Sequence, residues 1–271
     1  MARARFISII NILNEKVVQS YNFKKYLPIG DPKIAIDYMN NWGVDEIILL
    51  DIKNSIFKQD FVIKNLKRLT RDCQTPLTAG GGVCNLRQVE KIIKNGADKV
   101  VLNTGVQINK NLIRQSSQEF GSQAIVYSLD IKKEKDKFYF YKYSGTEKNS
   151  EDILDHIKRI QDEGAGEILI NSIDKDGTGR GFEISFLKKY KKFINIPIIL
   201  CGGYGKLNHI TKVLDQNISG FGIGNYLHHY EHSVKLIKKK IFQIYGKKSV
   251  RFENKINYHS HQVDLSGRLK A

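Results

Sequence analysis

Two parts of the chain repeat the same pattern, and this repeat restricts the possible folds more than any other feature. The stretch LTAGGGVCNLRQVEKIIKNGADKVVLNT, starting at Leu77, aligns without gaps on IILCGGYGKLNHITKVLDQNISGFGIGN, starting at Ile198, an offset of 121 positions. At the same offset EIILLDI aligns on EILINSI. An offset of 119 places the first apolar run, with Asn11, on the fifth, with Asp130. The chain therefore consists of two equivalent halves.

Short apolar runs alternate with amphipathic stretches along both halves. The runs are FISIINI, EIILLDI, LTAGGG, KVVLNTG, AIVYSLDI, EILINSID, IPIILCGG and FGIGN. Continuous apolar strands separated by helices are typical of a parallel sheet that is buried on both faces. Eight such units predict an α/β fold of the closed (βα)₈ or TIM-barrel type, built from two half-barrels, with an open doubly wound sheet as the alternative. We expect the barrel to span residues 1–245 and a basic tail to follow at 246–271.

Composition narrows the class of protein and the compartment. No apolar run approaches the ~20 residues of a membrane span, and MARARFISII lacks the features of a secretory signal. Three cysteines without C-x-x-C spacing favour reduced thiols and a cytoplasmic location. Most of the net charge of +16 is expected on solvated helix surfaces, and the rest would attract anionic ligands. Neither a nucleic-acid partner nor a membrane is expected.

Glycine pairs follow the third and seventh predicted strands. Such turns let backbone N–H groups approach an anion, and the next helix adds its dipole. The flexible stretch DKDGTGRGF, which follows the sixth strand, lies at the same end of the barrel. Because the motif occurs twice, the sequence predicts two phosphate sites and a ligand with a phosphate at each end. The candidate phosphate-binding residues are Gly81, Gly82, Asn103, Thr104, Asp176, Gly177, Gly202, Gly203, Gly224 and Asn225.

Several segments resemble the cyclase subunit family of imidazole glycerol phosphate synthase. They are NTGVQIN, FGSQAIVYSLDIK, INSIDKDGTGRGFE and GGYGKLNHI, and the likeness runs nearly without gaps from about Arg5 to residue 245. The resemblance implies a barrel that receives ammonia from a glutaminase subunit docked at its bottom face. At the top, ammonia would meet a bisphosphorylated substrate that is cleaved and cyclised. A related isomerase with the same doubled barrel is the nearest alternative, and it would have no glutaminase partner.

The resemblance also assigns residues to the bottom of the barrel. The family closes the ammonia passage with Arg, Glu, Lys and Glu at strand starts, which are here Arg5, Glu46, Lys99 and Glu167. Asp98 and Gln123 match residues that face the glutaminase in the family. These matches imply that ammonia delivery is retained.

At the top, the chain departs from the family pattern. The family uses two aspartates, at the ends of strands one and five, as general acid and base. Asp130 matches the second, but Asn11 occupies the first position, and an amide cannot exchange a proton near neutral pH. Gln19 stands where the family has a lysine, and Cys201 replaces a serine. The sequence therefore predicts altered or lost cyclase chemistry, with Asp130 as the remaining catalytic residue.

This combination resembles the divergent branch associated with acetamidino modification of bacterial surface sugars. There the barrel and its glutaminase would supply ammonia to a separate sugar amidotransferase. The alternatives are a genuine cyclase subunit of histidine biosynthesis and a non-catalytic ammonia conduit that activates the glutaminase. No cofactor is implied. No metal site is expected either, because no carboxylate or cysteine completes the cluster of His228, His229 and His232.

Overall fold

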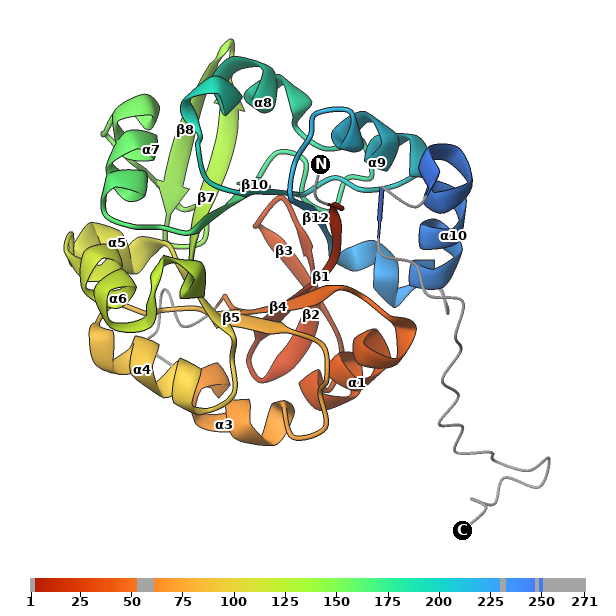
Figure 1. The fold of residues 1–271 in the computed structure, drawn as a ribbon, viewed down its shortest axis with the longest axis horizontal. Coiled ribbons are helices and arrows are strands. Elements are labelled where there is room, and N and C mark those ends of the chain that lie inside the picture. The colour runs from red at the N-terminus through yellow and green to blue at the C-terminus, as the bar shows by residue number, and fades with distance from the viewer. Residues whose placement is uncertain (1–2, 53–60, 230–232, 247–248, 251–271) are drawn as a thin grey trace.

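Eight parallel strands close into a barrel at the centre of the molecule (Figure 1). The computed structural model describes residues 3–52, 61–229, 233–246 and 249–250. In order around the barrel the strands are β1 (Arg5–Leu13), β4 (Glu46–Asp51), β5 (Leu77–Gly80), β6 (Lys99–Leu102), β7 (Ile125–Glu134), β10 (Glu167–Ser172), β11 (Ile198–Cys201) and β12 (Gly220–Ile223). Strand β12 pairs with β1, which closes the ring. The TIM-barrel prediction is confirmed, and the open-sheet alternative is wrong.

Helices surround the barrel and cover its outer surface (Figure 1). They are α1 (Pro32–Trp42), α3 (Phe61–Leu69), α4 (Leu86–Lys94), α5 (Thr104–Ile108), α6 (Leu112–Phe120), α7 (Ile153–Asp162), α8 (Ile184–Tyr190), α9 (Leu207–Leu214) and α10 (Ser233–Tyr245), with 3₁₀ turns η1 (Ser122–Ala124), η2 (Lys191–Phe193) and η3 (Asn225–His228). Local signals set the ends of α1: Asp31 accepts from the Lys33 amide at the start, and Gly43 stops the helix in the left-handed region. None of the helices in the described part of the chain is long and apolar enough to cross a membrane.

The strand register repeats between the two halves. Asn11 lies opposite Leu50 in the β1–β4 pair, and Asp130 lies opposite Asn171 in the β7–β10 pair. The partners Leu50 and Asn171 are 121 positions apart, which is the offset of the sequence repeat. The β5–β6 and β11–β12 pairs repeat in the same way, since Thr78 faces Lys99 and Ile199 faces Gly220. The internal repeat is therefore a structural repeat of half-barrels.

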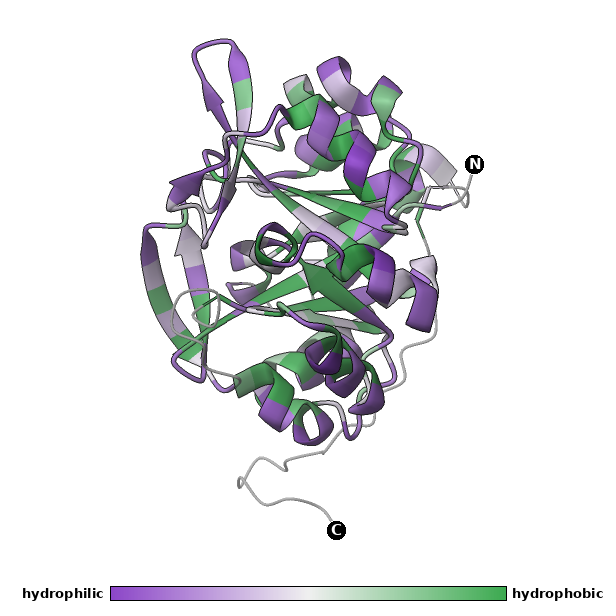
Figure 2. Cartoon of the chain, turned by 90° about the vertical axis from the view of Figure 1, so that its left-hand side faces the viewer, coloured by the Kyte–Doolittle hydropathy of each residue, from purple (hydrophilic) through white to green (hydrophobic). Residues whose placement is uncertain are grey.

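Hydrophobic residues predominate along the barrel strands (Figure 2), and they are buried on both faces of the sheet. One buried cluster occupies the barrel interior and consists of Ile7, Ile9, Ile48, Val101, Val126, Leu169, Ile199 and Cys201. A second, larger cluster lies between the strands and the helices. Burial on both faces explains why the strands are almost continuously apolar.

Two antiparallel extensions rise from the C-terminal end of the barrel. Strand β1 turns at Asn14 and Glu15, both with positive φ, and returns as β2 (Lys16–Tyr21), which pairs with β3 (Lys25–Gly30). Strand β7 likewise turns near Lys135 and continues into β8 (Lys137–Lys142) and β9 (Glu147–Lys148). We call these two extensions, residues 14–30 and 135–148, the first and second hairpins.

The end of the described chain returns to the N-terminal end of the barrel. After α10, Ser249 accepts from the Ala4 amide at 3.1 Å, and Val250 forms a bridge with Ala4. Most of the expected tail, residues 247–248 and 251–271, lies outside the described residues. The domain boundary at residue 245 coincides with the end of α10 and stays a prediction.

Candidate active site and barrel gate

Two pockets open at the C-terminal end of the barrel, one in each half. The first encloses about 90 Å³ and is lined by the Gly81–Gly82 turn, Asn103 and Thr104. The second encloses about 210 Å³. It contains the remaining candidate phosphate residues, which are Asp176, Gly177, Gly202, Gly203, Gly224 and Asn225. The structure thus brings each predicted group of residues together in its own pocket.

The glycines of both turns are required by close backbone packing. Gly81 has a φ of +119°, and a Cβ there would lie 2.3 Å from the Asp51 carbonyl oxygen. Gly203 has a φ of +99°, and its Cβ would lie 2.2 Å from the Gly181 carbonyl oxygen. Only glycine fits such positions, and the open backbone beside α4 and α9 suits an anion.

The polar side chains of the candidate phosphate sites are already engaged with other protein groups. Asn225 exchanges two hydrogen bonds with the Ser20 backbone, donating from Nδ2 at 2.7 Å and accepting at Oδ1 at 3.0 Å. Thr104 Oγ1 accepts from the Tyr143 amide at 2.9 Å. Asn103 Nδ2 donates to Asp130 at 2.7 Å. Glycine backbones, rather than these side chains, are therefore the groups left for an anion in this arrangement.

The two hairpins are anchored on equivalent places of the opposite half. Asn22 and Tyr143, 121 positions apart, both have left-handed backbones. Asn22 Nδ2 donates to the Ile173 carbonyl at 3.2 Å, and Ser144 Oγ donates to the Ile52 carbonyl at 3.0 Å. Those two carbonyls are also 121 positions apart. Each hairpin therefore ties one half-barrel to the other.

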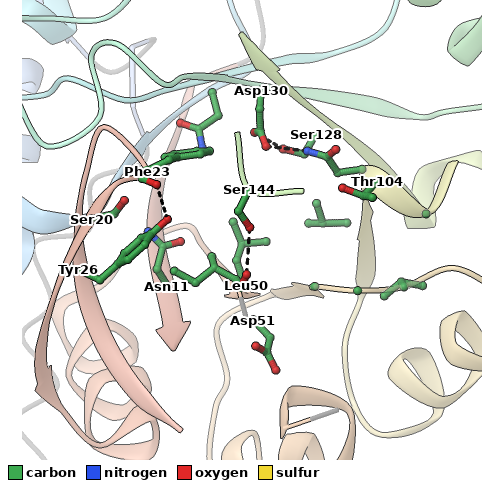
Figure 3. A pocket seen from close by; sticks show the side chains of 18 residues that line it. Asn11, Ser20, Phe23, Tyr26, Leu50, Asp51, Thr104, Ser128, Asp130 and Ser144 are labelled. Atoms are coloured by element: carbon green, nitrogen blue, oxygen red, sulfur yellow. Dashed lines mark hydrogen bonds between the residues drawn. The ribbon is translucent and has the colours of Figure 1, made fainter. Parts of the chain in front are cut away.

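Asp130 is the candidate catalytic acid at the mouth of the barrel. Asn103 and Ser128 both donate to its carboxylate, at 2.7 and 3.2 Å. Burial raises the pKa of Asp130 to about 7, although these two hydrogen bonds oppose the rise. A carboxyl with such a pKa can give or take a proton near neutral pH. Figure 3 shows Asp130 and Ser128 on one side of the first pocket and Asn11 and Tyr26 on another.

The surroundings of Asn11 differ from those of its counterpart. The positions equivalent to Ser128 and Asn103 are Ile9 and Gly224, which have no polar side chain to offer. Within the described residues, the Asn11 side chain makes no hydrogen bond of its own. The first half therefore lacks both the carboxylate and the donors that would support one.

The first hairpin adds further polar contacts at the mouth that the sequence did not predict. Tyr26 lines the first pocket and donates to the Phe23 carbonyl at 3.0 Å. Burial, together with the charges of Asp176 and Asp130, raises the pKa of Tyr26 to about 12, so its phenol stays protonated. Gln19 Nε2 donates to His229 Nε2 across 2.8 Å at the edge of the second pocket. Nothing in the sequence marks these contacts, because the fold of the first hairpin creates them.

Asp176 joins the second pocket to the first hairpin. Its carboxylate accepts from Ser20 Oγ at 2.5 Å and from the Phe23 amide at 3.4 Å. Burial raises the pKa of Asp176 to about 6, and these hydrogen bonds oppose the rise. Cys201 lines the same pocket, and burial raises the pKa of its thiol, which keeps it protonated.

At the opposite end of the barrel, the four predicted gate residues form one closed ring of alternating charges. Arg5 contacts Glu46 at 2.5 Å and also hydrogen-bonds Glu167. Lys99 Nζ lies 3.1 Å from Glu46 and 2.9 Å from Glu167. Burial alone lowers the pKa of a guanidinium, but Glu167 and then Glu46 raise the pKa of Arg5 above its usual value. The four charged groups therefore satisfy one another at the N-terminal end of the barrel.

The two candidate interface residues lie at this same end. Asp98 precedes β6 and accepts from the Leu77 amide at 2.7 Å, which fixes the start of β5. Gln123 lies in η1 before β7, and both side chains are exposed. His228 and His229 lie at the opposite end in and after η3, and His232 falls outside the described residues.

Comparisons with known proteins agree with this architecture. A family model described as "Histidine biosynthesis protein" matches residues 5–233. The chain is 35% identical to a putative imidazole glycerol phosphate synthase subunit hisF2 of Vibrio vulnificus, over 99% of this chain and 98% of that protein. It is 38% identical to the imidazole glycerol phosphate synthase subunit HisF of Sulfurisphaera tokodaii, over 79% and 86% of the two chains, and 33% identical to that of Methanocaldococcus jannaschii, over 88% and 96%.

Proposed function

Because the chain belongs to the histidine biosynthesis protein family, we propose that it is the barrel subunit of a glutamine amidotransferase complex. In this proposal a class I glutaminase docks at the charged end of the barrel and releases ammonia into it. The ammonia serves the acetamidino modification of a bacterial surface sugar in lipopolysaccharide biosynthesis, through a separate sugar amidotransferase in the cytoplasm. The cyclase activity of the family is weakened or lost.

The observation that carries the proposal is the replacement of one of two equivalent carboxylates by Asn11. Loss of one general acid or base typically lowers a rate by roughly 10²–10⁴-fold. The surroundings of the two positions also differ, since Ile9 and Gly224 stand where Ser128 and Asn103 support Asp130. A reaction that uses one carboxylate as acid and another as base requires an ionisable group at both positions, and Asn11 is not ionisable.

The closed ring at the other end supports retention of ammonia delivery. Charges removed from water are costly unless they are paired, so four of them at an axial position need a reason to be there. A gate that can open for a small neutral molecule supplies that reason. Asp98 and Gln123, exposed beside the ring, offer a place for the glutaminase.

The extent of the match to the V. vulnificus protein also supports a separate branch. A match over 99% of the chain takes in most of the residues after Tyr245, whereas the match to the S. tokodaii protein covers 79%. The C-terminal stretch is thus a feature shared with the protein named hisF2. Surface-polysaccharide genes beside the gene for this chain would agree with the proposal, and histidine-pathway genes would speak for the cyclase.

A genuine cyclase subunit of histidine biosynthesis is the second candidate. Both glycine pockets and Asp130, with its pKa near neutrality, favour it. A third candidate is a non-catalytic conduit that only activates the glutaminase. All three candidates begin with the release of ammonia by the glutaminase, so one assay tests this step for all of them.

That assay measures glutamine hydrolysis by the cognate glutaminase with and without the barrel. We expect the barrel to co-purify with the glutaminase and to raise its rate at least tenfold. Gln123→Arg is expected to reduce the stimulation, and Asn111→Arg, an exposed change at the other end of the barrel, is expected to leave it intact. An unchanged hydrolysis rate would contradict every ammonia-fed role and leave a phosphosugar isomerase without a partner.

A further inference from the structure

Two carboxamide side chains lie at the junction of the two glycine pockets. Asn11, on β1, and Asn171, on β10, each line both pockets. They thus occupy the centre of the barrel mouth, between the two anion cradles. A ligand group that bridges the pockets must pass both of them.

The Asn171 carboxamide is almost fully buried and its oxygen is not satisfied by protein. Its residue is 8% exposed, and among the described residues Oδ1 has no hydrogen-bond partner. Native proteins rarely leave a buried polar atom unpaired, because the atom loses water and gains nothing in exchange. An unpaired atom in a side chain that lines a pocket is therefore expected to be completed by water or by a bound ligand.

Asn171 is also in direct contact with the second anion cradle. A Cβ placed on Gly202 would lie 3.4 Å from Asn171 Oδ1, so the carboxamide packs beside the glycine turn. An anion on the Gly202–Gly203 turn would therefore place its next few atoms beside the two carboxamides. On the other side stands Asp130, whose carboxylate already accepts from Asn103 and Ser128.

We propose that Asn11 and Asn171 form a subsite for a neutral carboxamide or N-acyl group on a phosphorylated ligand, with the phosphate on the Gly202–Gly203 turn. A carboxamide presents an N–H donor and a carbonyl acceptor, and so does each asparagine, so the groups can pair reciprocally. A ligand carboxylate would face Asp130 and be repelled. A ligand hydroxyl would leave part of the subsite unpaired, which is costly in a buried site.

The subsite lies between the two halves of the barrel and is not repeated. The position equivalent to Asn171 is Leu50, which lies opposite Asn11 in the sheet and lines the first pocket. The pair of carboxamides therefore has no copy in the repeat, because its counterparts are Asp130 and Leu50. A ligand with one amide group would bind in a single orientation, despite the repeated architecture.

Binding of three sugar phosphates that differ at one substituent tests the proposal. The probes are N-acetylglucosamine 1-phosphate, glucosamine 1-phosphate and glucose 1-phosphate, and their choice rests on the proposed role in sugar modification. By calorimetry we expect the acetamido compound to bind about tenfold more tightly than each of the others. Equal affinities for all three, or tightest binding of the amine, would overturn the subsite. The glutaminase assay involves no sugar phosphate, so its result tests the proposed function independently of the subsite.

Substitution by the counterpart residue separates a direct role from misfolding. Asn171→Leu places at this position the residue that the other half already accommodates at Leu50. We expect this variant to lose the preference for the acetamido compound while its affinity for glucose 1-phosphate stays within about twofold of the original. Asn11→Leu should behave in the same way. A preference that survives both substitutions would also overturn the proposal.

Discussion

Ser20 and Asn225 are joined by two reciprocal hydrogen bonds, although they lie 205 positions apart. The asparagine side chain pairs with the backbone of β2 as another strand would. It therefore anchors the first hairpin on the second half-barrel, next to the second glycine pocket. Asp176 adds a further contact to the same serine, at 2.5 Å. The first hairpin is thus held by residues that the sequence suggested for phosphate binding.

This anchorage depends on a glycine at position 177. Gly177 has a φ of +71°, and a Cβ there would lie 2.4 Å from the Ser20 carbonyl oxygen. We expect Gly177→Ala to push the first hairpin off its anchors and to increase amide hydrogen exchange across residues 16–30. Gly179→Ala is the matched control, because its φ is +65° and its nearest heavy atom, in Gly205, is 3.7 Å away. Similar exchange in the two variants would show that backbone strain alone explains the effect.

Lys99 lies between two buried glutamates in the ring of charges at the N-terminal end of the barrel. Its ammonium contacts Glu46 and Glu167, which are 2% and 5% exposed. In Lys99→Met, Arg5 would be the one cation left in the ring to balance the carboxylates of Glu46 and Glu167. We expect it to lower the free energy of unfolding by on the order of 2–4 kcal/mol, measured by denaturant titration.

A lysine on the outer surface provides the comparison for the ring. Lys94 pairs with Glu90 on α4 and is 71% exposed in its side chain. Lys94→Met is expected to leave stability nearly unchanged, since exposed pairs are screened by water. A loss at Lys99 no larger than that at Lys94 would contradict a tightly coupled ring.

The stability of the protein is expected to depend on pH through Asp130. Burial raises its pKa from the usual 3.8 to about 7, so between these values the folded state holds a proton that the unfolded state releases. The protonated carboxyl supports folding fully below about pH 4, and this support is lost as the pH rises through 7. We therefore expect Asp130→Asn to be more stable than the original at pH 8, by on the order of 2–4 kcal/mol, and equally stable near pH 4.

Thermal unfolding of both proteins between pH 4 and pH 8 would measure this difference. Asp136→Asn, in the exposed turn of the second hairpin, serves as the control for loss of one negative charge. A constant difference between Asp130→Asn and the original at all pH values would contradict the raised pKa.

The sequence predicted the barrel well because its strongest signals are periodic. Alternating apolar runs and a gapless repeat determine both the strands and their register, as the equivalent pairs Asn11–Leu50 and Asp130–Asn171 demonstrate. The four residues of the charged ring were indicated by the resemblance to the cyclase family, and the structure brings them together. The grouping of glycines into two pockets followed from the repeat itself.

The contacts within the site could not be predicted, because they depend on segments that meet only in three dimensions. Asn225 and Thr104 look like anion ligands in the sequence, yet their oxygens accept from the hairpins. The first hairpin has no glycine in its tight turn, where Asn14 and Glu15 take the left-handed backbone instead, so no turn signal marked it. The unpaired oxygen of Asn171 depends on burial, which the sequence does not report.

Restoring the missing carboxylate is expected to give an acid rather than a base. A carboxyl group introduced at position 11 would lack the donors that Ser128 and Asn103 supply to Asp130. In the double variant Asn11→Asp, Asp130→Asn we expect the pKa of the introduced carboxyl to exceed the value of about 7 at Asp130 in the original protein. Carbon-detected NMR titration of the carboxyl groups in the two proteins measures both values. A lower pKa at position 11 would show that the first half still supports a carboxylate.

The barrel, in our proposal, has kept its ammonia path and given up the cyclase reaction. The decisive quantity is the rate of imidazole glycerol phosphate formation from the bisphosphorylated cyclase substrate, with ammonium chloride as the ammonia source and no glutaminase present. An authentic cyclase from histidine biosynthesis is the positive control. We expect a turnover at least roughly 10²-fold below that control, because one acid–base group is missing. Turnover equal to the control would contradict the proposal and identify the chain as a working cyclase.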